Sequence, residues 1–180
     1  EVINDTTGLI SLTGKYGIGM YSNGSKATND GTITSTSANN VIGMHSATNT
    51  VGVASALKNT GRINLTGSDN VGISLTGAGT TGTTTGSSKV TLSGDNSTGI
   101  SVAKGSALTA DAGTTTVKGN GAYGIVVDDN AASTMSSTGK LTVSGATGSA
   151  GESSTRGSVG IAVMNTAATG LTGSLDATIH

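Results

Sequence analysis

The sequence contains no cysteine, proline, tryptophan or phenylalanine, and only 3 tyrosines. Large aromatic side chains bury the most area per residue in globular cores, so their scarcity argues against a thick core. The absence of cysteine excludes disulfide bonds as a source of stability. With 30 glycines among its 180 residues, the chain predicts a thin core filled by Ile, Val, Leu, Met and Ala.

Charge is also sparse. The chain has 9 Lys or Arg residues against 10 Asp or Glu residues, which gives a net charge of -1. Proteins that bind nucleic acid usually carry a basic surface, and we expect no nucleic-acid partner. Disordered chains combine low hydrophobicity with high net charge, so the low charge here favours a folded chain.

Long apolar runs are absent as well. No run approaches the roughly 20 residues that a helix needs to cross a bilayer, and we expect this segment not to be embedded in a membrane. The first residues, Glu1–Asn4, have neither a basic n-region nor an apolar h-region. We therefore expect no signal peptide in this sequence.

Two short signatures recur along the chain. One places Gly before Met or Ile, with the glycine at positions Gly19, Gly43, Gly72, Gly99, Gly124 and Gly160. The other precedes it and starts at the anchor residues Ile10, Ile33, Ile63, Val90, Thr115 and Leu141. The distance from anchor to glycine is 9 residues in four repeats, 10 in one and 19 in the last, and the full period is mostly near 27 residues.

Both signatures alternate apolar and polar residues with a period of two, as strands do. In the third repeat we expect Val71, Ile73 and Leu75 to point inward, and Gly72 and Ser74 to point outward. The recurrent glycine then marks either a bulge or the close approach of another backbone. A chain that returns at a fixed period stacks like residues on like, so the sequence predicts an all-β fold, a parallel β-helix (solenoid) of about six rungs.

Each rung has room for a third, shorter strand in its variable part. Its expected inward residues are Ala27, Leu57 and Met135. The bend between the first two strands carries Asn40, Asp69 and Asn96, residues that tolerate turn conformations.

The sixth repeat contains about ten extra residues between its two signatures. We expect residues 144–158, rich in Gly and Ser, to form a surface loop outside the solenoid. Leu141 and Ile161 then keep their places in the inward columns. Because loops often carry binding residues, Glu152 and Arg156, the only charges of this loop, are candidate ligand contacts.

The repeat units resemble a known family. Asn59-Thr60-Gly61-Arg62-Ile63-Asn64-Leu65-Thr66-Gly67 and Asp69-Asn70-Val71-Gly72-Ile73-Ser74 are similar to the passenger repeats of fusobacterial type V autotransporter adhesins, the RadD-like large outer-membrane proteins. The resemblance covers essentially the whole chain. It implies a right-handed β-helix, with residues 1–180 as one segment of a longer passenger.

The same resemblance implies a function and a location. The segment is expected to lie outside the cell, attached to the outer membrane through a C-terminal barrel in a further part of the chain. Its expected role is adhesion in virulence, or the extension of an adhesive tip. Its expected partner is a protein or glycan receptor on a host or bacterial surface.

Three basic residues, Arg62, Lys89 and Lys140, each stand one position before an anchor, with Thr114 at the same place in between. They form a candidate stripe for an acidic glycan or receptor, or a set of charges that keeps sheet edges from associating. Tyr21 and His45 are expected side by side on the outer surface, as a second candidate contact or as ordinary surface residues.

The main alternative is a polysaccharide-cleaving β-helix enzyme, a lyase or glycoside hydrolase. That chemistry needs paired carboxylates or an acidic calcium cluster. Only Asp128 and Asp129 are adjacent, and we interpret them as a solvated turn. The 2 histidines, without cysteine, form no metal set. We therefore expect no catalytic residues, no metal, no cofactor and no enzyme activity. Ice binding would need a more regular threonine array than this chain has.

Overall fold

Residues 1–135, 139–144, 157–164, 171–173 and 176–179 are described by the computed structural model. Every regular element in these ranges is a β-strand, and none of them contains a helix. The strands form three parallel sheets, which we name A, B and C in the order in which the chain visits them.

Sheet A contains β1 (Val2–Asn4), β4 (Lys26–Asn29), β7 (Ala56–Asn59), β10 (Thr81–Thr84), β13 (Ala107–Asp111), β16 (Ala132–Met135) and β19 (Leu171–Gly173). Sheet B contains β2 (Leu9–Leu12), β5 (Thr32–Ser35), β8 (Arg62–Thr66), β11 (Lys89–Ser93), β14 (Thr114–Lys118), β17 (Lys140–Ser144) and β20 (Asp176–Ile179). Sheet C contains β3 (Ile18–Asn23), β6 (Ile42–Ala47), β9 (Val71–Thr76), β12 (Thr98–Ala103), β15 (Tyr123–Asp128) and β18 (Val159–Met164).

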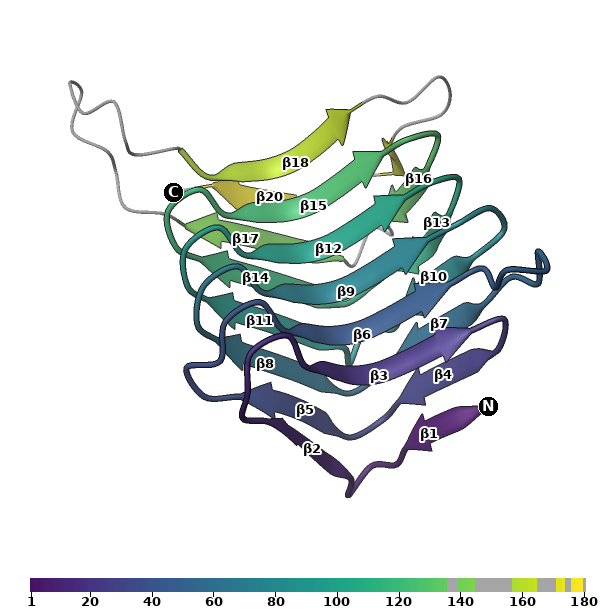
Figure 1. The fold of residues 1–180 in the computed structure, drawn as a ribbon. Coiled ribbons are helices and arrows are strands. Elements are labelled where there is room, and N and C mark those ends of the chain that lie inside the picture. The colour runs from purple at the N-terminus through teal and green to yellow at the C-terminus, as the bar shows by residue number, and fades with distance from the viewer. Residues whose placement is uncertain (136–138, 145–156, 165–170, 174–175, 180) are drawn as a thin grey trace.

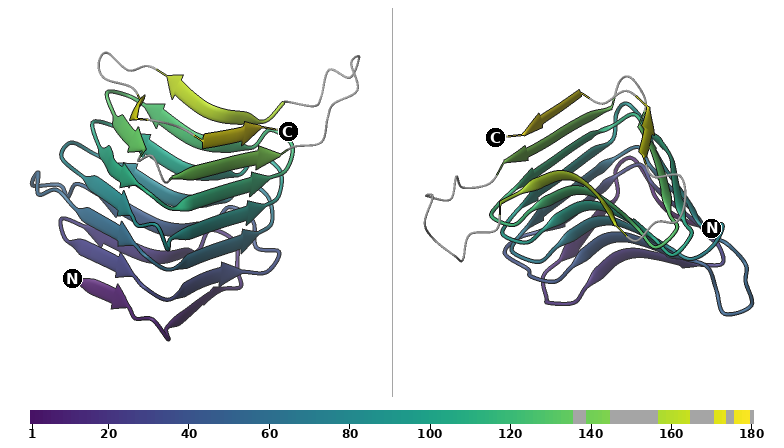
Figure 2. Two further views of the ribbon diagram at one scale, coloured as in Figure 1. Left: turned by 180° about the vertical axis from the view of Figure 1, so that it is seen from behind. Right: turned by 90° about the horizontal axis from the view of Figure 1, so that it is seen from above.

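The chain passes through sheets A, B and C in turn, and each strand pairs with the equivalent strand of the next rung. In Figure 1 the sheet C strands lie in front, run from left to right and rise from the N-terminal to the C-terminal end. That direction makes the coil right-handed. Seen along its axis, the solenoid has a three-sided outline (Figure 2). The prediction of a right-handed parallel β-helix of about six rungs is confirmed.

The register of the sheets matches the predicted columns. In sheet B, the anchors pair as Ile33 with Ile63, and Val90 with Thr115. In sheet C, Met44 pairs with Ile73, and the column continues along the sheet to Ile125 and Ile161. The third strand is also confirmed. Its predicted inward residues Ala27 and Leu57 are buried, and Met135 ends β16 with its side chain outside the described part.

The predicted direction of the recurrent glycine is wrong. A Cβ added to Gly72 would lie 2.5 Å from the Gly99 carbonyl oxygen and 2.5 Å from Cγ1 of Val90, a buried side chain. Gly72 therefore faces the core, and Val71 before it faces outward and is only half-buried. Ile73, directly after the glycine, is buried too, so the inside-outside alternation slips by one residue at this point.

The same contact recurs from rung to rung. The equivalent Cβ positions lie 2.4 to 2.7 Å from the carbonyl oxygen of the next glycine and 2.6 to 2.8 Å from a sheet B anchor side chain. It is seen in turn at Gly19, Gly43, Gly99 and Gly124. Of the two explanations that the sequence allowed, the close approach of another backbone is thus confirmed.

The bend between sheets B and C has the predicted turn residues in left-handed conformation. The φ angles are 57° for Asn40, 59° for Asp69 and 55° for Asn96. Asparagine and aspartate tolerate this region better than other non-glycine residues. These residues let the chain turn the corner into each sheet C strand.

A buried polar ladder lies at the corner between sheets A and B. The Asn4 side-chain amide donates to Oδ1 of Asn29 at 2.8 Å, and the Asn29 amide donates to Oδ1 of Asn59 at 2.7 Å. The Asn59 amide then donates to Oγ of Ser88 at 2.6 Å. Each side-chain amide therefore forms a hydrogen bond with a side chain on the next rung, which offsets the desolvation cost of burying it.

Two segments are longer than their equivalents in the regular rungs. Of the predicted loop 144–158, Ser144 belongs to β17, and residues 145–156 lie outside the described part. Leu141 is buried and Ile161 packs against the core, as predicted. A second loop joins β6 to β7 and projects from the solenoid (Figure 1). Its tip residue Val51 is 80% exposed.

We predict that Gly72→Ala destabilises the protein by about 1–3 kcal/mol, the usual cost of overpacking a core. The added methyl would clash with the Gly99 carbonyl oxygen and with Val90. The matched control is Gly86→Ala, where the nearest atom, the Ala112 carbonyl oxygen, lies 3.9 Å away. Urea unfolding followed by circular dichroism measures both. Equal unfolding midpoints for the two variants would contradict the inward direction of Gly72.

We also predict that Asn29→Ala costs more than Asn64→Ala. Asn29 is fully buried within the ladder. Its removal leaves the Asn59 carbonyl oxygen without the Asn29 donor and the Asn4 amide with only a long hydrogen bond of 3.4 Å to the Thr32 carbonyl oxygen, and a buried unsatisfied group costs about 1–3 kcal/mol. Asn64 is exposed on sheet B, and its replacement is expected to change stability by less than about 0.5 kcal/mol. Thermal unfolding of the two variants tests this order. A ladder that does not contribute to stability would leave them alike.

Candidate functional site

The outer side of sheet B gathers basic side chains in one column. Arg62 pairs with Lys89, Lys89 with Thr114, and Thr114 with Lys140. All three basic residues are exposed. The structure therefore brings the predicted stripe together on neighbouring rungs.

Lys118 joins this group and was missed in the sequence. It ends β14, is exposed, and occupies the rung where Thr114 interrupts the basic column. The predicted stripe contains only residues directly before an anchor, whereas Lys118 stands three positions after the anchor Thr115. The strand register, with Ser93 and Ser144 as its neighbours, was the signal that could have found it.

We name the outer side of β8, β11, β14 and β17 the basic face. Its central column consists of Asn64, Thr91, Thr116 and Thr142, whose side chains can donate and accept hydrogen bonds. None of these four strands contains an aspartate or glutamate; the next strand of the sheet, β20, begins with Asp176, which pairs with Lys140. The basic face thus offers one cation on each of four rungs, without a carboxylate in its strands.

Two shallow depressions flank Arg62. One of about 310 Å³ is lined by Thr32, Arg62, Ile63, Asn64, Lys89 and Thr91. The other, of about 280 Å³, lies toward the corner with sheet A and is lined by Thr6, Asp30, Gly31, Thr32, Thr60, Gly61, Arg62 and Ser87. The first depression combines two cations with hydroxyl and amide groups, so it can receive an anionic or polyhydroxylated group.

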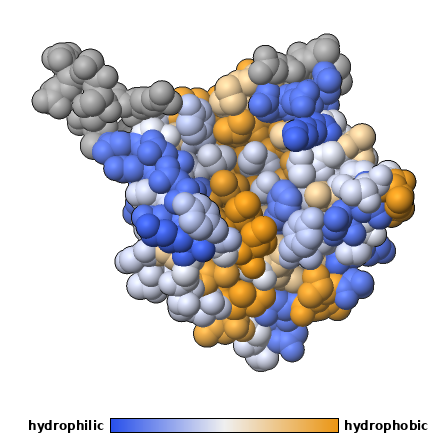
Figure 3. Space-filling model, viewed as in Figure 1, coloured by the Kyte–Doolittle hydropathy of each residue, from blue (hydrophilic) through white to orange (hydrophobic). Residues whose placement is uncertain are grey.

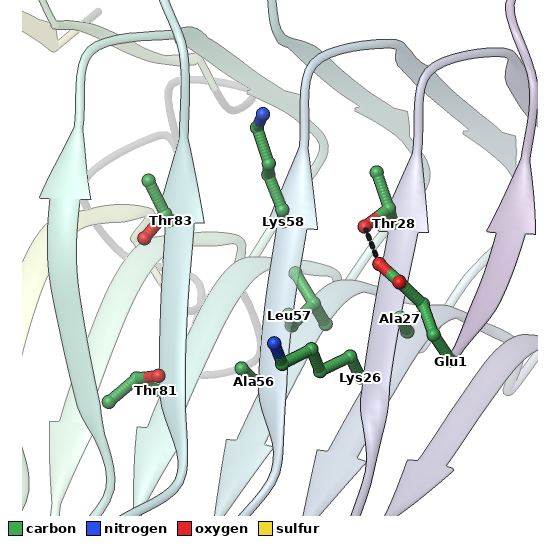
Figure 4. A pocket seen from close by; sticks show the side chains of 9 residues that line it. All are labelled: Glu1, Lys26, Ala27, Thr28, Ala56, Leu57, Lys58, Thr81 and Thr83. Carbon is green, nitrogen blue, oxygen red and sulfur yellow. Dashed lines mark hydrogen bonds between the residues drawn. The ribbon is translucent and has the colours of Figure 1, made fainter.

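A third depression, of about 300 Å³, lies over sheet A (Figure 4). Lys26 and Lys58 extend from neighbouring strands there, and their ammonium groups point in different directions (Figure 4). The Thr28 hydroxyl donates a hydrogen bond of 3.2 Å to the Glu1 carboxylate within the same depression. Because a carboxylate is present and the cations do not converge, this place is less suited to an anion than the basic face.

Tyr21 and His45 are neighbours on the outer side of sheet C, as predicted. Their rings stack with centroids 5.4 Å apart and an angle of 3° between the planes. His45 Nδ1 lies 3.0 Å from Oγ of Ser74 on the next rung. Partial burial lowers the pKa of His45, since desolvation penalises the charged imidazolium. The rings thus occupy one face of each other, which leaves less ring surface for a ligand.

Apolar residues also follow the outer side of sheet C (Figure 3). The residue before each recurrent glycine faces outward, which places Ile18, Ile42, Val71, Tyr123 and Val159 on this side. Thr98 takes the equivalent position on the fourth rung. Val71 was expected to point inward, and its outward direction is a direct result of the slip in alternation at the glycines.

The remaining candidate residues do not form a site in the described part of the chain. Asp128 ends β15 and is half-buried, and Asp129 begins the exposed turn after it; the Asp129 backbone N–H donates to Oδ1 of Asp128 at 2.8 Å. The predicted turn is therefore confirmed at Asp129, directly after the strand. Glu152 and Arg156 lie outside the described residues. Within the described ranges, no group of three or more His, Cys, Asp or Glu could hold a metal ion.

Two findings bear on membrane insertion and on family membership. No helix able to cross a membrane occurs in the ranges that the structure describes. Comparison of the chain with protein-family models, curated proteins and solved structures finds no match. A function for this chain is therefore proposed from the basic face and from the geometry of the solenoid.

We predict that His45 makes the stability of the protein depend on pH. Its pKa in the folded state is lower than the value near 6.5 of an unfolded chain, so the unfolded state binds a proton first as the pH falls. The stability contribution is present above about pH 6.5 and is lost as the pH falls through the folded pKa.

The measurement is the thermal midpoint of the wild type and of His45→Gln at about pH 7.5 and about pH 5. The wild type is expected to lose more stability between these values than the variant. Asp5, whose pKa is lowered by hydrogen bonds from Thr7, starts from 3.8 and titrates below this window. Identical losses for the two proteins would show that His45 is not the titrating group.

Proposed function

We propose that this chain is a non-catalytic module of a bacterial cell-surface adhesin of the autotransporter type, exposed outside the cell and attached to the outer membrane. The solenoid holds a contact surface at a distance from the membrane, and the basic face is that surface. The observation that carries the proposal is the set of four cations among hydroxyl and amide groups on four successive rungs, with no carboxylate in the same strands.

The architecture suits extension. Every rung hydrogen-bonds to the next through three sheets at once, and successive rungs are roughly 4.8 Å apart. A solenoid grows by addition of rungs while its cross-section stays constant. Residues on the outer columns can therefore change with little effect on the core, which is what a surface that contacts varied receptors requires.

The family resemblance agrees with this role. The units that resemble autotransporter passenger repeats supply the inward anchors and the bends, and Arg62 belongs to one of them. The competing proposal is a polysaccharide-cleaving enzyme. Its chemistry needs two carboxylates about 5–9.5 Å apart around the substrate, and the four strands of the basic face supply none.

Two assays on the same preparation test the proposal. The fluorescently labelled chain is expected to bind intact bacterial or host epithelial cells in a saturable manner, and unlabelled chain should compete. Incubation with a panel of polysaccharides should release no oligosaccharide above the rate of a heat-unfolded sample. Sustained sugar release would replace the adhesin by the enzyme, and failure to bind any cell surface would contradict adhesion by this segment.

A further inference from the structure

We propose that the basic face binds a linear polysaccharide that carries carboxylate or sulfate groups, laid along the solenoid axis. This inference rests on the proposed adhesive function and gives its ligand a chemical class. It depends on the spacing of the cations, on the hydrogen-bonding groups between them, and on the absence of acidic and aromatic residues from strands β8, β11, β14 and β17.

The spacing is regular along the axis. β8 carries Arg62, β11 carries Lys89, β14 carries Lys118 and β17 carries Lys140, so each of four successive rungs presents one cation. Rungs are roughly 4.8 Å apart, and the four cations therefore follow the axis over about three such steps. Arg62, Lys89 and Lys140 share one column, and Lys118 stands four residues farther along its strand, roughly 13 Å to one side. A linear polymer with repeated negative groups can contact several of them at once, whereas a single small anion contacts one or two.

The local charge differs from that of the whole chain. The net charge is -1, with 9 basic residues in all, yet 4 of them lie on the basic face and its strands hold no acid. The four strands are thus positive on a molecule that is nearly neutral. Acids adjoin them at both ends, since Asp176 of β20 pairs with Lys140 and Asp30 lines a depression together with Arg62. Arg62 can also bind a carboxylate or sulfate with two parallel hydrogen bonds, and the lysines act as point charges.

The groups between the cations suit a sugar. Asn64, Thr91, Thr116 and Thr142 form a column along the centre of the face, and each can donate and accept a hydrogen bond. Sugar hydroxyls have the same double capacity. The depression of about 310 Å³ between Arg62 and Lys89 gives one ring of such a polymer a place to sit.

Other macromolecules fit this face less well. Proteins that bind single-stranded nucleic acids combine a basic groove with aromatic rings on which the bases stack, and strands β8, β11, β14 and β17 contain no aromatic residue. The binding energy of protein interfaces comes mostly from a few buried residues, which are most often Trp, Tyr or Arg, and of these the four strands contain only Arg62. An acidic polysaccharide uses both features that are present, cations and hydroxyl groups.

The experiment measures binding of the whole chain to immobilised alginate, heparin and neutral dextran, with single-stranded DNA as a further arm. Alginate carries carboxylates alone and heparin carries sulfates as well, so the two separate the sources of negative charge. The test variant is R62Q/K89Q/K118Q/K140Q. The matched control is K15Q/K26Q/K58Q/K104Q, which removes four exposed lysines on other parts of the molecule and gives the same net charge.

The wild type is expected to bind at least one of the two acidic polysaccharides, with affinity that falls as salt rises, and to bind dextran much more weakly. The basic-face variant should lose affinity about tenfold or more, since each exposed ion pair contributes modestly and four are removed. The control should lose less than about threefold. Circular dichroism spectra and thermal midpoints of both variants check that the fold is unchanged.

Several results would overturn the inference. These are equal losses in the two variants, equal binding of dextran, tighter binding of single-stranded DNA, or no binding of the wild type to either acidic polysaccharide at low salt. Cell binding separates this inference from the proposed function. If the basic-face variant loses cell binding although the wild type binds neither acidic polysaccharide, the ligand class is wrong while the adhesive role of the basic face stands. If the variant still binds cells like the wild type, the basic face is not the adhesive surface and both proposals fail.

Discussion

The distance between sheets B and C depends on the close packing at each recurrent glycine, where there is no room for a side chain. At each recurrent glycine, the space where a Cβ would lie is already occupied by the carbonyl oxygen of the next glycine and by an anchor side chain from sheet B. Val90 fills it at Gly72, and Ile63 fills it at Gly43. A backbone this close to a neighbouring side chain is a packing that only glycine allows.

The rest of the cross-section follows from that contact. The glycine and the residue after it both face the core, and Ile73 and Leu75 fill the interior opposite sheet B. The residue before it turns outward. The core remains thin and needs no aromatic side chain, and at the corner between sheets A and B it is completed by the amides of Asn29 and Asn59.

The sequence was sufficient to predict the fold because its period was visible in residues that must be apolar. The anchors and the Met or Ile after each glycine gave the number of rungs and the register of two sheets. The sequence was insufficient to predict which way Val71 and Gly72 face. Strict alternation was assumed, and a slip of one residue at the glycine leaves the amino-acid pattern unchanged. The asparagine ladder was missed for a related reason. Asn4, Asn29 and Asn59 lie in the variable part of the rung, and only the three-dimensional register shows that they meet.

The same limit applied to the candidate site. Arg62, Lys89 and Lys140 were found because they share one position relative to the anchors. Lys118 was missed because it lies across the strand from them. A face of a sheet is defined by neighbouring rungs and by alternate residues along each strand, so a search along a single column recovers only part of it.

The three parallel sheets also determine how the molecule responds to force. Their strands run across the solenoid axis, and successive rungs are held together along it by hydrogen bonds and stacked side chains. Tension along the axis loads these contacts one rung at a time from either end. One rung, such as the 25 residues from Ile100 to Ile125, releases roughly 80–90 Å of extended chain when it detaches. The stack therefore acts as a tether that lengthens in steps under load, with the intact rungs beyond each break still folded.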